Sequence, residues 1–304
     1  MREPAEPGKL GAWILAARPK TLPVAVVPVV VGSAIAFAET TMFSMSVAVI
    51  AMLCALLIQI GTNLHNDVSD FERGADDPAT RLGPRRATAE GWLQPAVVSR
   101  AAAVSFASAF FIGLYLVAIG GWPILLLGII SITAGYAYSG GPRPIAYTCF
   151  GEAFVLAFFG LAAVGGTYYL QASGLLTGAA MLGGIAIGLP AAAVLVVNNT
   201  RDLDEDRCAG RRTFPVVFGK SASRIEYAGF MFASLLLAWA TAWRLGAGAW
   251  AAVCLVMLPW AYRLCRRFRM ASDPNDFNEL LAATARFGLS LGAVLAFVLV
   301  VTNR

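Results

Sequence analysis

The amino-acid sequence predicts an all-α integral membrane protein with nine transmembrane helices. Hydrophobic residues make up 58% of the 304 residues and charged residues only 13%, and the mean hydropathy is +0.69. Nearly all of the chain divides into apolar runs of about 17 to 25 residues, the length that crosses ~30 Å of hydrocarbon. The runs lack the polar faces of soluble helices. Because lipid offers the backbone no hydrogen-bond partners, each run is expected to be a helix.

The first expected span follows a short amino-terminal segment, residues 1–17, and is delayed by Arg18, Pro19 and Lys20. Further apolar runs then follow one another to the carboxyl end, and we treat residues 1–304 as a single membrane-embedded domain. In chain order the runs cover roughly residues 20–38, 43–64, 96–119, 122–140, 147–170, 177–199, 225–243, 246–265 and 285–302.

Two connections are much longer than the others, residues 65–95 and residues 200–224. Long loops on a rigid scaffold usually carry function. Each of these begins with Asn and Asp at a helix end, continues through Arg and acids, and reaches a Gly-containing basic stretch, which hints at an internal duplication. Since four expected spans separate them, both loops emerge on one face and are predicted to be active-site loops.

The basic residues predict which face is cytoplasmic. If the chain starts inside, all but Arg244 and Arg304 of its 23 Lys and Arg residues lie on or next to the side of the amino terminus. The positive-inside rule then places the amino terminus and both long loops in the cytoplasm. A composition rich in Ala, Gly and Arg suggests a GC-rich bacterial gene, so we expect a multi-pass protein of the bacterial inner membrane.

Several classes of protein are disfavoured. No signal-peptide cleavage pattern follows the amino terminus. Five cysteines form an odd number with no C-x-x-C pair, which argues against disulfides and zinc. His65 is the only histidine, which argues against haem and His-rich di-iron sites. For His65 itself, a general-base role and a structural role at a helix end both remain open.

Two polar clusters interrupt the apolar chain and hold oxygen ligands at four-residue spacing. On a helix this spacing places side chains on one face, about 6 Å apart along the axis. Such a face can share one or two divalent cations. Mg²⁺ is the natural candidate, because no soft ligand lies nearby and Mg²⁺ binds carboxylates, water and substrate phosphate. The first cluster comprises Asn63, Asn66, Asp67 and Asp70, and the second comprises Asn198, Asp202 and Asp206.

Basic residues follow both clusters and suit a phosphate group, because guanidinium groups pair with phosphate oxygens bidentately. Mixed charges also occur in ordinary solvated loops, but two such loops on one membrane face favour a site. The basic residues are Arg73, Arg81, Arg85 and Arg86 in the first long loop and Arg201, Arg207, Arg211, Arg212 and Lys220 in the second.

Carboxylates at membrane edges usually mark function, because a charge near the bilayer centre costs roughly 2.5 to 3.5 kcal/mol. Asp67 and Asp202 stand at the ends of apolar spans. An ion-coupled transporter would also show this pattern, but Glu152 is the only acid that approaches a mid-span position, and it sits near a helix start. A non-catalytic assembly subunit is a further alternative.

At these clusters the chain resembles the UbiA-type family of membrane prenyltransferases, whose motifs are N-D-x-x-D-x-x-x-D and D-x-x-x-D. The last acid of the first motif would fall at Gly74, and the next acids here are Asp76 and Asp77. That variation, together with the Gly-rich segment from Tyr138 to Pro142, is similar to the menaquinone branch, the 1,4-dihydroxy-2-naphthoate polyprenyltransferases (MenA). The resemblance covers essentially the whole chain. The motif residues that match are Asn66, Asp67 and Asp70, and then Asp202 and Asp206.

The resemblance implies a nine-helix bundle around a central cavity, capped on the cytoplasmic side by the two aspartate-rich loops. It implies Mg²⁺-dependent transfer of a polyprenyl group from polyprenyl diphosphate to 1,4-dihydroxy-2-naphthoate, with loss of diphosphate and carbon dioxide to give demethylmenaquinol. 4-Hydroxybenzoate and homogentisate remain alternative acceptors. We expect the lipid bilayer as a further partner and no nucleic acid, while the oligomeric state and the prenyl chain length stay open.

The resemblance also implies roles for individual residues, some with simpler alternatives. Arg18 and Lys20 open the first span and could contact diphosphate or snorkel to the interface. The tyrosines could anchor the chain there, and Asn66 and Asn199 could cap helix ends. The expected catalytic acids are Asp67, Asp70, Asp202 and Asp206, joined as metal ligands by Asn66 and Asp76. The expected diphosphate-binding residues are Lys20, Arg73, Arg81, Arg143, Arg207 and Arg211. The expected substrate-pocket residues are Asn63, Asn199, Tyr138 and Tyr147.

Overall fold

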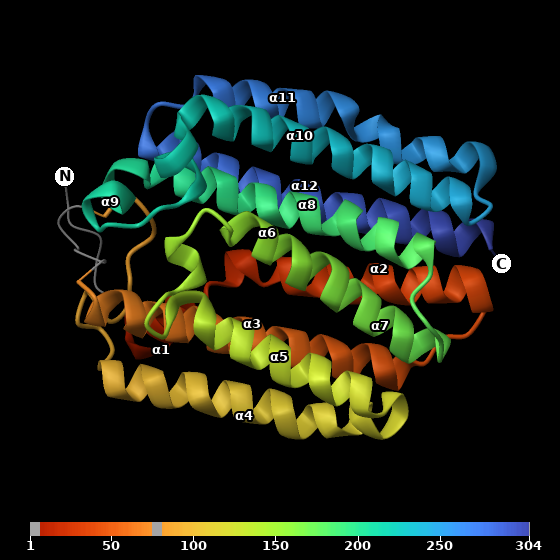
Figure 1. Ribbon diagram of the computed structural model, residues 1–304, viewed down its shortest axis with the longest axis horizontal. Coiled ribbons are helices and arrows are strands. Elements are labelled where there is room, and N and C mark those ends of the chain that lie inside the picture. The colour runs from red at the N-terminus through yellow and green to blue at the C-terminus, as the bar shows by residue number, and fades with distance from the viewer. Residues whose placement is uncertain (1–6, 75–80, 304) are drawn as a thin grey trace.

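The computed structural model describes residues 7–74 and 81–303 as a bundle of helices that run from one end of the molecule to the other (Figure 1). Within these residues nine helical segments are long and apolar enough to cross a membrane, and the described chain contains no β-strand. The predicted fold class is therefore confirmed. Asp76, an expected metal ligand, lies outside the described residues.

Six of the spanning segments are single helices and three are composite or kinked. The single helices are α2 (Pro23–Thr40), α3 (Met45–Glu72), α4 (Pro95–Gly120), α5 (Trp122–Ser139), α8 (Gly178–Arg201) and α12 (Pro274–Thr302). The others are α6 (Gly151–Val155) with the π-helix η3 (Leu156–Ala162) and α7 (Ala163–Ala172), the kinked α10 (Phe214–Arg244), and the 3-10 segment η4 (Gly248–Met257) with α11 (Leu258–Met270). The short elements are α1 (Lys9–Ala17), η1 (Pro19–Thr21), η2 (Ile145–Tyr147) and α9 (Leu203–Cys208).

Both long connections contain more helix than the sequence indicates. Helix α3 continues to Glu72, so the acids of the first cluster stand on its last two turns. In the second connection, α9 and the first turns of α10 replace most of the expected loop. Helix α10 starts after Thr213 with Pro215 among its first residues, a position that suits proline, and Gly219 kinks it with a φ of 83°.

The two clusters lie at the same end of the bundle, which we call the polar end (left in Figure 1, near α9 and the N label). The amino-terminal half, α2–α5, and the carboxyl-terminal half, from α6 onward, both send helix ends there. A large apolar core joins α2, α8, α10, α11 and α12, with Tyr227, Met231 and Phe287 fully buried. A smaller core joins α2, α3, α4, α5 and α7.

Glycines let the fifth spanning segment approach α8 very closely. A Cβ added at Gly160 would come within 2.6 Å of the Gly184 carbonyl oxygen and 3.1 Å of Gly188 Cα. Small residues allow this kind of close packing between membrane helices, and the π-helix of η3 includes the contact. The two segments are thereby held together below their polar ends, which carry Glu152 and Asn199.

Candidate active site

A cavity of about 410 Å³ extends into the bundle from the polar end. The α3 residues that line it extend from Asp70 to Ala51, about 28 Å along the helix axis at 1.5 Å per residue. Its inner part is lined by Leu116, Val117 and Ile124. The cavity therefore joins a charged entrance to an apolar interior, and its whole length along α3 is almost the thickness of a bilayer core.

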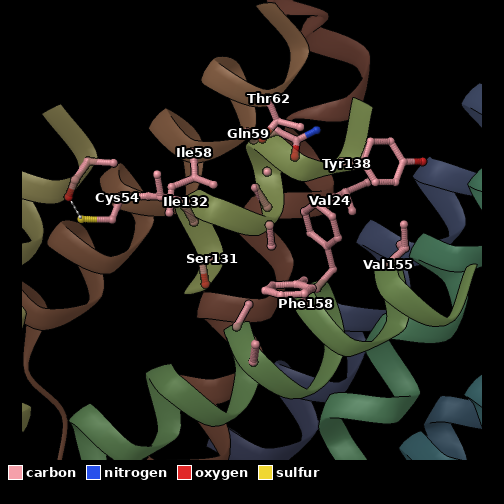
Figure 2. Close-up of a pocket in the computed structure, with 18 of the residues that line it drawn as sticks. Val24, Cys54, Ile58, Gln59, Thr62, Ser131, Ile132, Tyr138, Val155 and Phe158 are labelled. Carbon is pink, nitrogen blue, oxygen red and sulfur yellow. Dashed lines mark hydrogen bonds between the residues drawn. The ribbon is translucent and has the colours of Figure 1, made fainter. Parts of the chain in front are cut away.

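The middle of the cavity mixes a few polar groups with apolar walls (Figure 2). Gln59 and Thr62 come from α3, Ser131 from α5 and Phe158 from η3. Tyr138 also lines the cavity, and its ring centroid lies 5.7 Å from that of Phe154. An aromatic wall thus follows the polar entrance inward, because Phe154 in turn packs 4.5 Å from Phe158.

The acids of the first cluster are held by the first long connection. Asp67 is only 1% exposed, and Thr88 Oγ1 donates to its Oδ1 over 3.0 Å. The other oxygen, Oδ2, is buried without a hydrogen-bond partner among the described residues. Asp70 lines the cavity and pairs with Arg86 at 3.2 Å and with Arg211 at 2.9 Å.

The acids of the second cluster are held in two different ways. Asp206 accepts a hydrogen bond from Thr213 Oγ1 at 3.1 Å and pairs with Arg211 at 3.3 Å. Burial raises the pKa of Asp206 to about 6, although the Arg211 charge opposes the shift. Asp202 forms two hydrogen bonds with its neighbour Arg201, at 2.6 and 2.7 Å. Its carboxylate is therefore neutralised within its own segment.

Arg211 connects the two clusters. Its guanidinium contacts Asp70 from α3 and Asp206 from α9, and it stacks over the Tyr147 ring at 4.4 Å. Although burial disfavours its charge, Asp70, Tyr147 and Asp206 together raise the pKa of Arg211 above its usual value. Carboxylates from the two halves of the molecule thus meet around one cation at the mouth of the cavity.

The first long connection also reaches the second cluster. The Leu82 backbone N–H donates to Glu205 Oε1 at 2.9 Å. At Gly83 the connection passes so close to Arg201 that an added Cβ would lie 2.8 Å from Arg201 Nη2. Arg201 in turn donates to Asn278 of α12 at 2.7 Å. The connection therefore covers the arginine that holds Asp202.

The expected site residues fall into two sets. Among those in the described chain, the cavity is lined by Asn63, Asn66, Asp70, Tyr138, Asn199 and Arg211. Asp67, Asp202 and Asp206 lie outside this lining, as do Lys20, Arg73, Arg81, Arg143, Arg207 and Tyr147.

The residues of the second set differ in their contacts. Arg73 donates to the Gly141 carbonyl at 2.6 Å and lies 5.4 Å from the Tyr147 ring, so it stays near the entrance. Arg207 forms an exposed pair with Asp204 at 3.6 Å. Lys20 and Arg143 are exposed at the polar end.

Carboxylate and amide oxygens are the ligands that a hard cation prefers, but those at the site do not lie together in one coordination shell. Within residues 7–74 and 81–303, no three His, Cys, Asp or Glu side chains stand close enough together to hold a metal ion. Two observations still favour a cation here. The buried Asp67 Oδ2 lacks a partner in that part of the chain, and Arg211 places a positive charge between Asp70 and Asp206.

Four polar residues at the site were not among the expected metal, diphosphate-binding or pocket residues, although Arg86 is one of the loop arginines that suit a phosphate. Arg18 and Arg86 line the cavity, and Thr88 and Thr213 bind the buried acids. A sequence signal exists for three of them, because Arg-Arg-Ala-Thr at 85–88 and Arg-Arg-Thr at 211–213 are similar. No comparable pattern marks Arg18, which adopts a left-handed backbone with φ 53° between α1 and η1.

His65 stands apart from the cavity. Its ring stacks on Tyr136 with centroids 4.3 Å apart, and Tyr136 is 52% exposed. The His65 Nε2 atom lies 3.2 Å from Ser69 Oγ. These contacts favour the structural alternative for His65.

Comparison with known proteins gives a consistent picture. The model of the UbiA prenyltransferase family matches residues 25–291. The chain is 35% identical to the 1,4-dihydroxy-2-naphthoate octaprenyltransferase of Escherichia coli (strain K12), over 91% of each chain. It is 33% identical to the Mycobacterium tuberculosis protein of the same name, over 94% of this chain and 97% of the relative. The Bacillus subtilis counterpart is 30% identical over 94% and 91%.

Solved structures with the same fold are more distant in sequence. A UbiA homologue from Aeropyrum pernix K1 superposes with a TM-score of 0.69 at 15% identity, over 93% of this chain and 96% of that one. A UbiA homologue from Archaeoglobus fulgidus, bound to DMAPP and Mg²⁺, gives a TM-score of 0.63 at 17% identity, over 94% and 99%. At these identities the likeness establishes the fold.

Proposed function

This chain belongs to the UbiA prenyltransferase family, and from that premise we propose that it transfers a polyprenyl group from polyprenyl diphosphate to 1,4-dihydroxy-2-naphthoate. Diphosphate and carbon dioxide leave, and demethylmenaquinol forms. The names of relatives 30% to 35% identical support this acceptor. The observation that carries the proposal is the meeting of Asp70 and Asp206 around Arg211, at the polar mouth of a long apolar cavity.

The diphosphate would bind at the mouth, where the arginines are. Arg86 and Arg211 both line the cavity there, and both already contact Asp70. Their guanidinium groups can turn from a carboxylate to phosphate oxygens, which they bind with the same bidentate geometry. The prenyl tail would then extend inward along the apolar α3, α4 and α5 walls.

The acids suit Mg²⁺, because carboxylate oxygens are its preferred ligands. Asp67, Asp70, Asp202 and Asp206 would hold it, with Asn66 beside them. When bound, Mg²⁺ would neutralise the charge on the diphosphate leaving group. The Archaeoglobus fulgidus homologue bound to DMAPP and Mg²⁺ supports this choice of cofactor.

In the transfer step the bond between the prenyl C1 and the diphosphate oxygen breaks, and diphosphate leaves with the electron pair. A new C–C bond forms at the ring carbon that carries the carboxylate, and the ring regains its aromatic electrons when carbon dioxide leaves. The allylic cation needs an environment without water. Tyr138, Phe154 and Phe158 could stabilise it by cation–π contact, worth about 0.5 to 2 kcal/mol.

The proposal is tested with the purified protein in lipid nanodiscs. Prenyl diphosphates of several lengths are offered with 1,4-dihydroxy-2-naphthoate, 4-hydroxybenzoate and homogentisate in competition, and prenylated products and released diphosphate are measured. We expect decarboxylated naphthol product that requires Mg²⁺ and is lost with EDTA. Product from another acceptor alone would reassign the substrate. Absence of any product, with flux across proteoliposomes instead, would favour the transporter.

We also propose that the polar end faces the cytoplasm, because all but two of the Lys and Arg residues lie on or next to that side of the membrane. Cys208 in α9 is exposed at this end and offers a native probe. A membrane-impermeant maleimide should label Cys208 in inverted vesicles but not in intact cells. Labelling from outside would reverse the orientation.

A further inference from the structure

We propose that Glu152 is a positioning residue that orients the side-chain amide of Asn199, so that the Asn199 carbonyl oxygen faces the cavity and accepts a hydrogen bond from a hydroxyl group of the aromatic acceptor. The inference rests on the proposed function and adds to it a subsite for that hydroxyl. It gives a task to a buried acid that the metal and diphosphate roles leave unused.

Glu152 is a carboxylate in an unusual place. It is only 2% exposed, stands in the first turn of α6 inside a membrane-spanning segment, and carries a buried Oε2 without a hydrogen-bond partner among the described residues. Its Oε1 accepts a hydrogen bond from Asn199 Nδ2 at 2.8 Å. Burial of an acid with so few partners is costly, which calls for a specific reason.

The chemistry of the pair fixes the direction of the amide. In its ionised form Glu152 can only accept hydrogen bonds, so Asn199 then has to turn its NH₂ group toward Glu152, which is the direction found in the structure. The Asn199 side chain lines the cavity, and its Oδ1 accepts no hydrogen bond within the described chain. Donation to a carboxylate also polarises the amide and strengthens its carbonyl oxygen as an acceptor.

Three other asparagines line the cavity, and two of them differ from Asn199 in this respect. The Oδ1 of Asn66 accepts from Ser139 Oγ at 2.5 Å, but a hydroxyl can donate or accept and so leaves the amide direction free. Asn198 is fully engaged, because it accepts from Arg201 at 2.9 Å and donates to Asp202 at 3.3 Å. Asn63 has a fixed amide as well, because its Nδ2 donates to the Ala17 carbonyl at 3.0 Å, but Asn199 is the one whose amide direction is set by a carboxylate.

A fixed carbonyl oxygen suits a hydroxyl donor, and the two ring hydroxyls are the donors of a dihydroxynaphthoate. The position is also suitable, since Asn199 lies on α8 between the cavity-lining Leu195 and the acids of the second cluster. Two other roles are possible for the pair. The Asn199 oxygen could bind the metal, or Glu152 could simply fasten α6 to α8, and the experiment separates these outcomes.

The test is a reciprocal exchange. In Glu152→Gln the new amide can donate or accept, so the direction of the Asn199 amide is no longer dictated. We expect the KM for the aromatic acceptor to rise roughly three- to tenfold, the loss of about one hydrogen bond, with little change in kcat or in the KM for prenyl diphosphate. Asn199→Asp sets two carboxylates against each other and should raise the same KM.

The double variant Glu152→Gln/Asn199→Asp restores the arrangement in reverse. The introduced amide donates to the introduced carboxylate, whose second oxygen again faces the cavity as an acceptor. Its acceptor KM should return to within about threefold of the wild-type value. If Glu152 and Asn199 only hold α6 against α8, the variants should have a lower melting temperature and an unchanged KM for the aromatic acceptor. That result would overturn the proposal.

Glu39→Gln is the matched control, because Glu39 is another acid of a membrane-spanning helix that accepts a side-chain hydrogen bond, from the Tyr168 hydroxyl, and it does not line the cavity. Its acceptor KM should equal the wild-type value. A shift in the Mg²⁺ dependence instead of the acceptor KM would assign the Asn199 oxygen to the metal and overturn the hydroxyl subsite. A wild-type enzyme without any prenylated product would refute the proposed function itself.

Discussion

The two aspartate clusters occupy corresponding places in the two halves of the molecule, yet they are held differently. In each, a threonine from the following basic segment binds a buried acid, Thr88 for Asp67 and Thr213 for Asp206. In the first cluster Asp70 receives arginines from both halves. In the second cluster Asp202 is satisfied by the adjacent Arg201. The first cluster is therefore the one whose acid pairs with an arginine of the other half, whereas the acids of the second cluster pair with arginines of their own half.

The comparison shows that each half of the molecule supplies contacts to the aspartate cluster of the other half. Arg211 of the second connection reaches the first cluster, and Leu82 and Gly83 of the first connection cover the second. A duplicated unit could bind its own acids by itself, but the mouth of the cavity forms only when the two connections cross. Four sets of variants test this comparison.

Loss of a cluster acid should have the largest effect. Asp67→Asn, Asp70→Asn and Asp206→Asn each remove a charge that would stabilise the leaving diphosphate, and we expect kcat to fall by roughly 10²-fold or more. The control is Asp204→Asn, because Asp204 is an exposed acid of α9 and its loss should leave turnover unchanged. Near wild-type activity in the cluster variants would refute the role of both clusters.

Arg211→Lys should come next. Lysine keeps the charge but not the fork that contacts Asp70 and Asp206 together, so kcat should fall roughly tenfold or more. The neighbouring Arg212 is exposed, and Arg212→Lys should have little effect. Equal, small effects of the two variants on product formation would mean that Arg211 does not connect the halves.

A smaller effect is expected where the first connection crosses the second cluster. Gly83→Ala would place a methyl group 2.8 Å from Arg201 Nη2, and overpacking of this kind costs about 1 to 3 kcal/mol. Displacement of Arg201 should loosen Asp202 and lower turnover several-fold. Gly229→Ala is the control, since an added Cβ there meets no described atom within 4 Å. Unchanged activity of Gly83→Ala would show that the crossing is not needed.

The threonines should have the smallest effect, and the two should behave alike. Thr88→Val and Thr213→Val leave a buried carboxylate oxygen without its donor, which costs about 1 to 3 kcal/mol. We expect both to lower the melting temperature in thermal-shift assays, while Thr40→Val at the opposite end of the bundle should change it less. A clear drop for one threonine alone would argue that the clusters are not counterparts.

The sequence by itself determined the class of protein and the position of its polar clusters. Hydrophobic length is a local property, so nine spans followed from counting apolar residues, and an even number of spans between Asp67 and Asp202 put both acids at one end. The sequence predicted the ends of the helices less well. The extension of α3 to Glu72 and the start of α10 after Thr213 are decided by tertiary packing, which overrides the polar character of those residues.

Only the tertiary structure decided how the acids are held. The contacts of Arg211 with Asp70, of Gly83 with Arg201 and of Glu152 with Asn199 join residues far apart in the chain, and each depends on how separate segments pack together at the polar end. A spacing of four residues places side chains on one face of one helix. Which cation or amide meets that face from elsewhere is fixed by long-range packing, for which a single sequence holds no local signal.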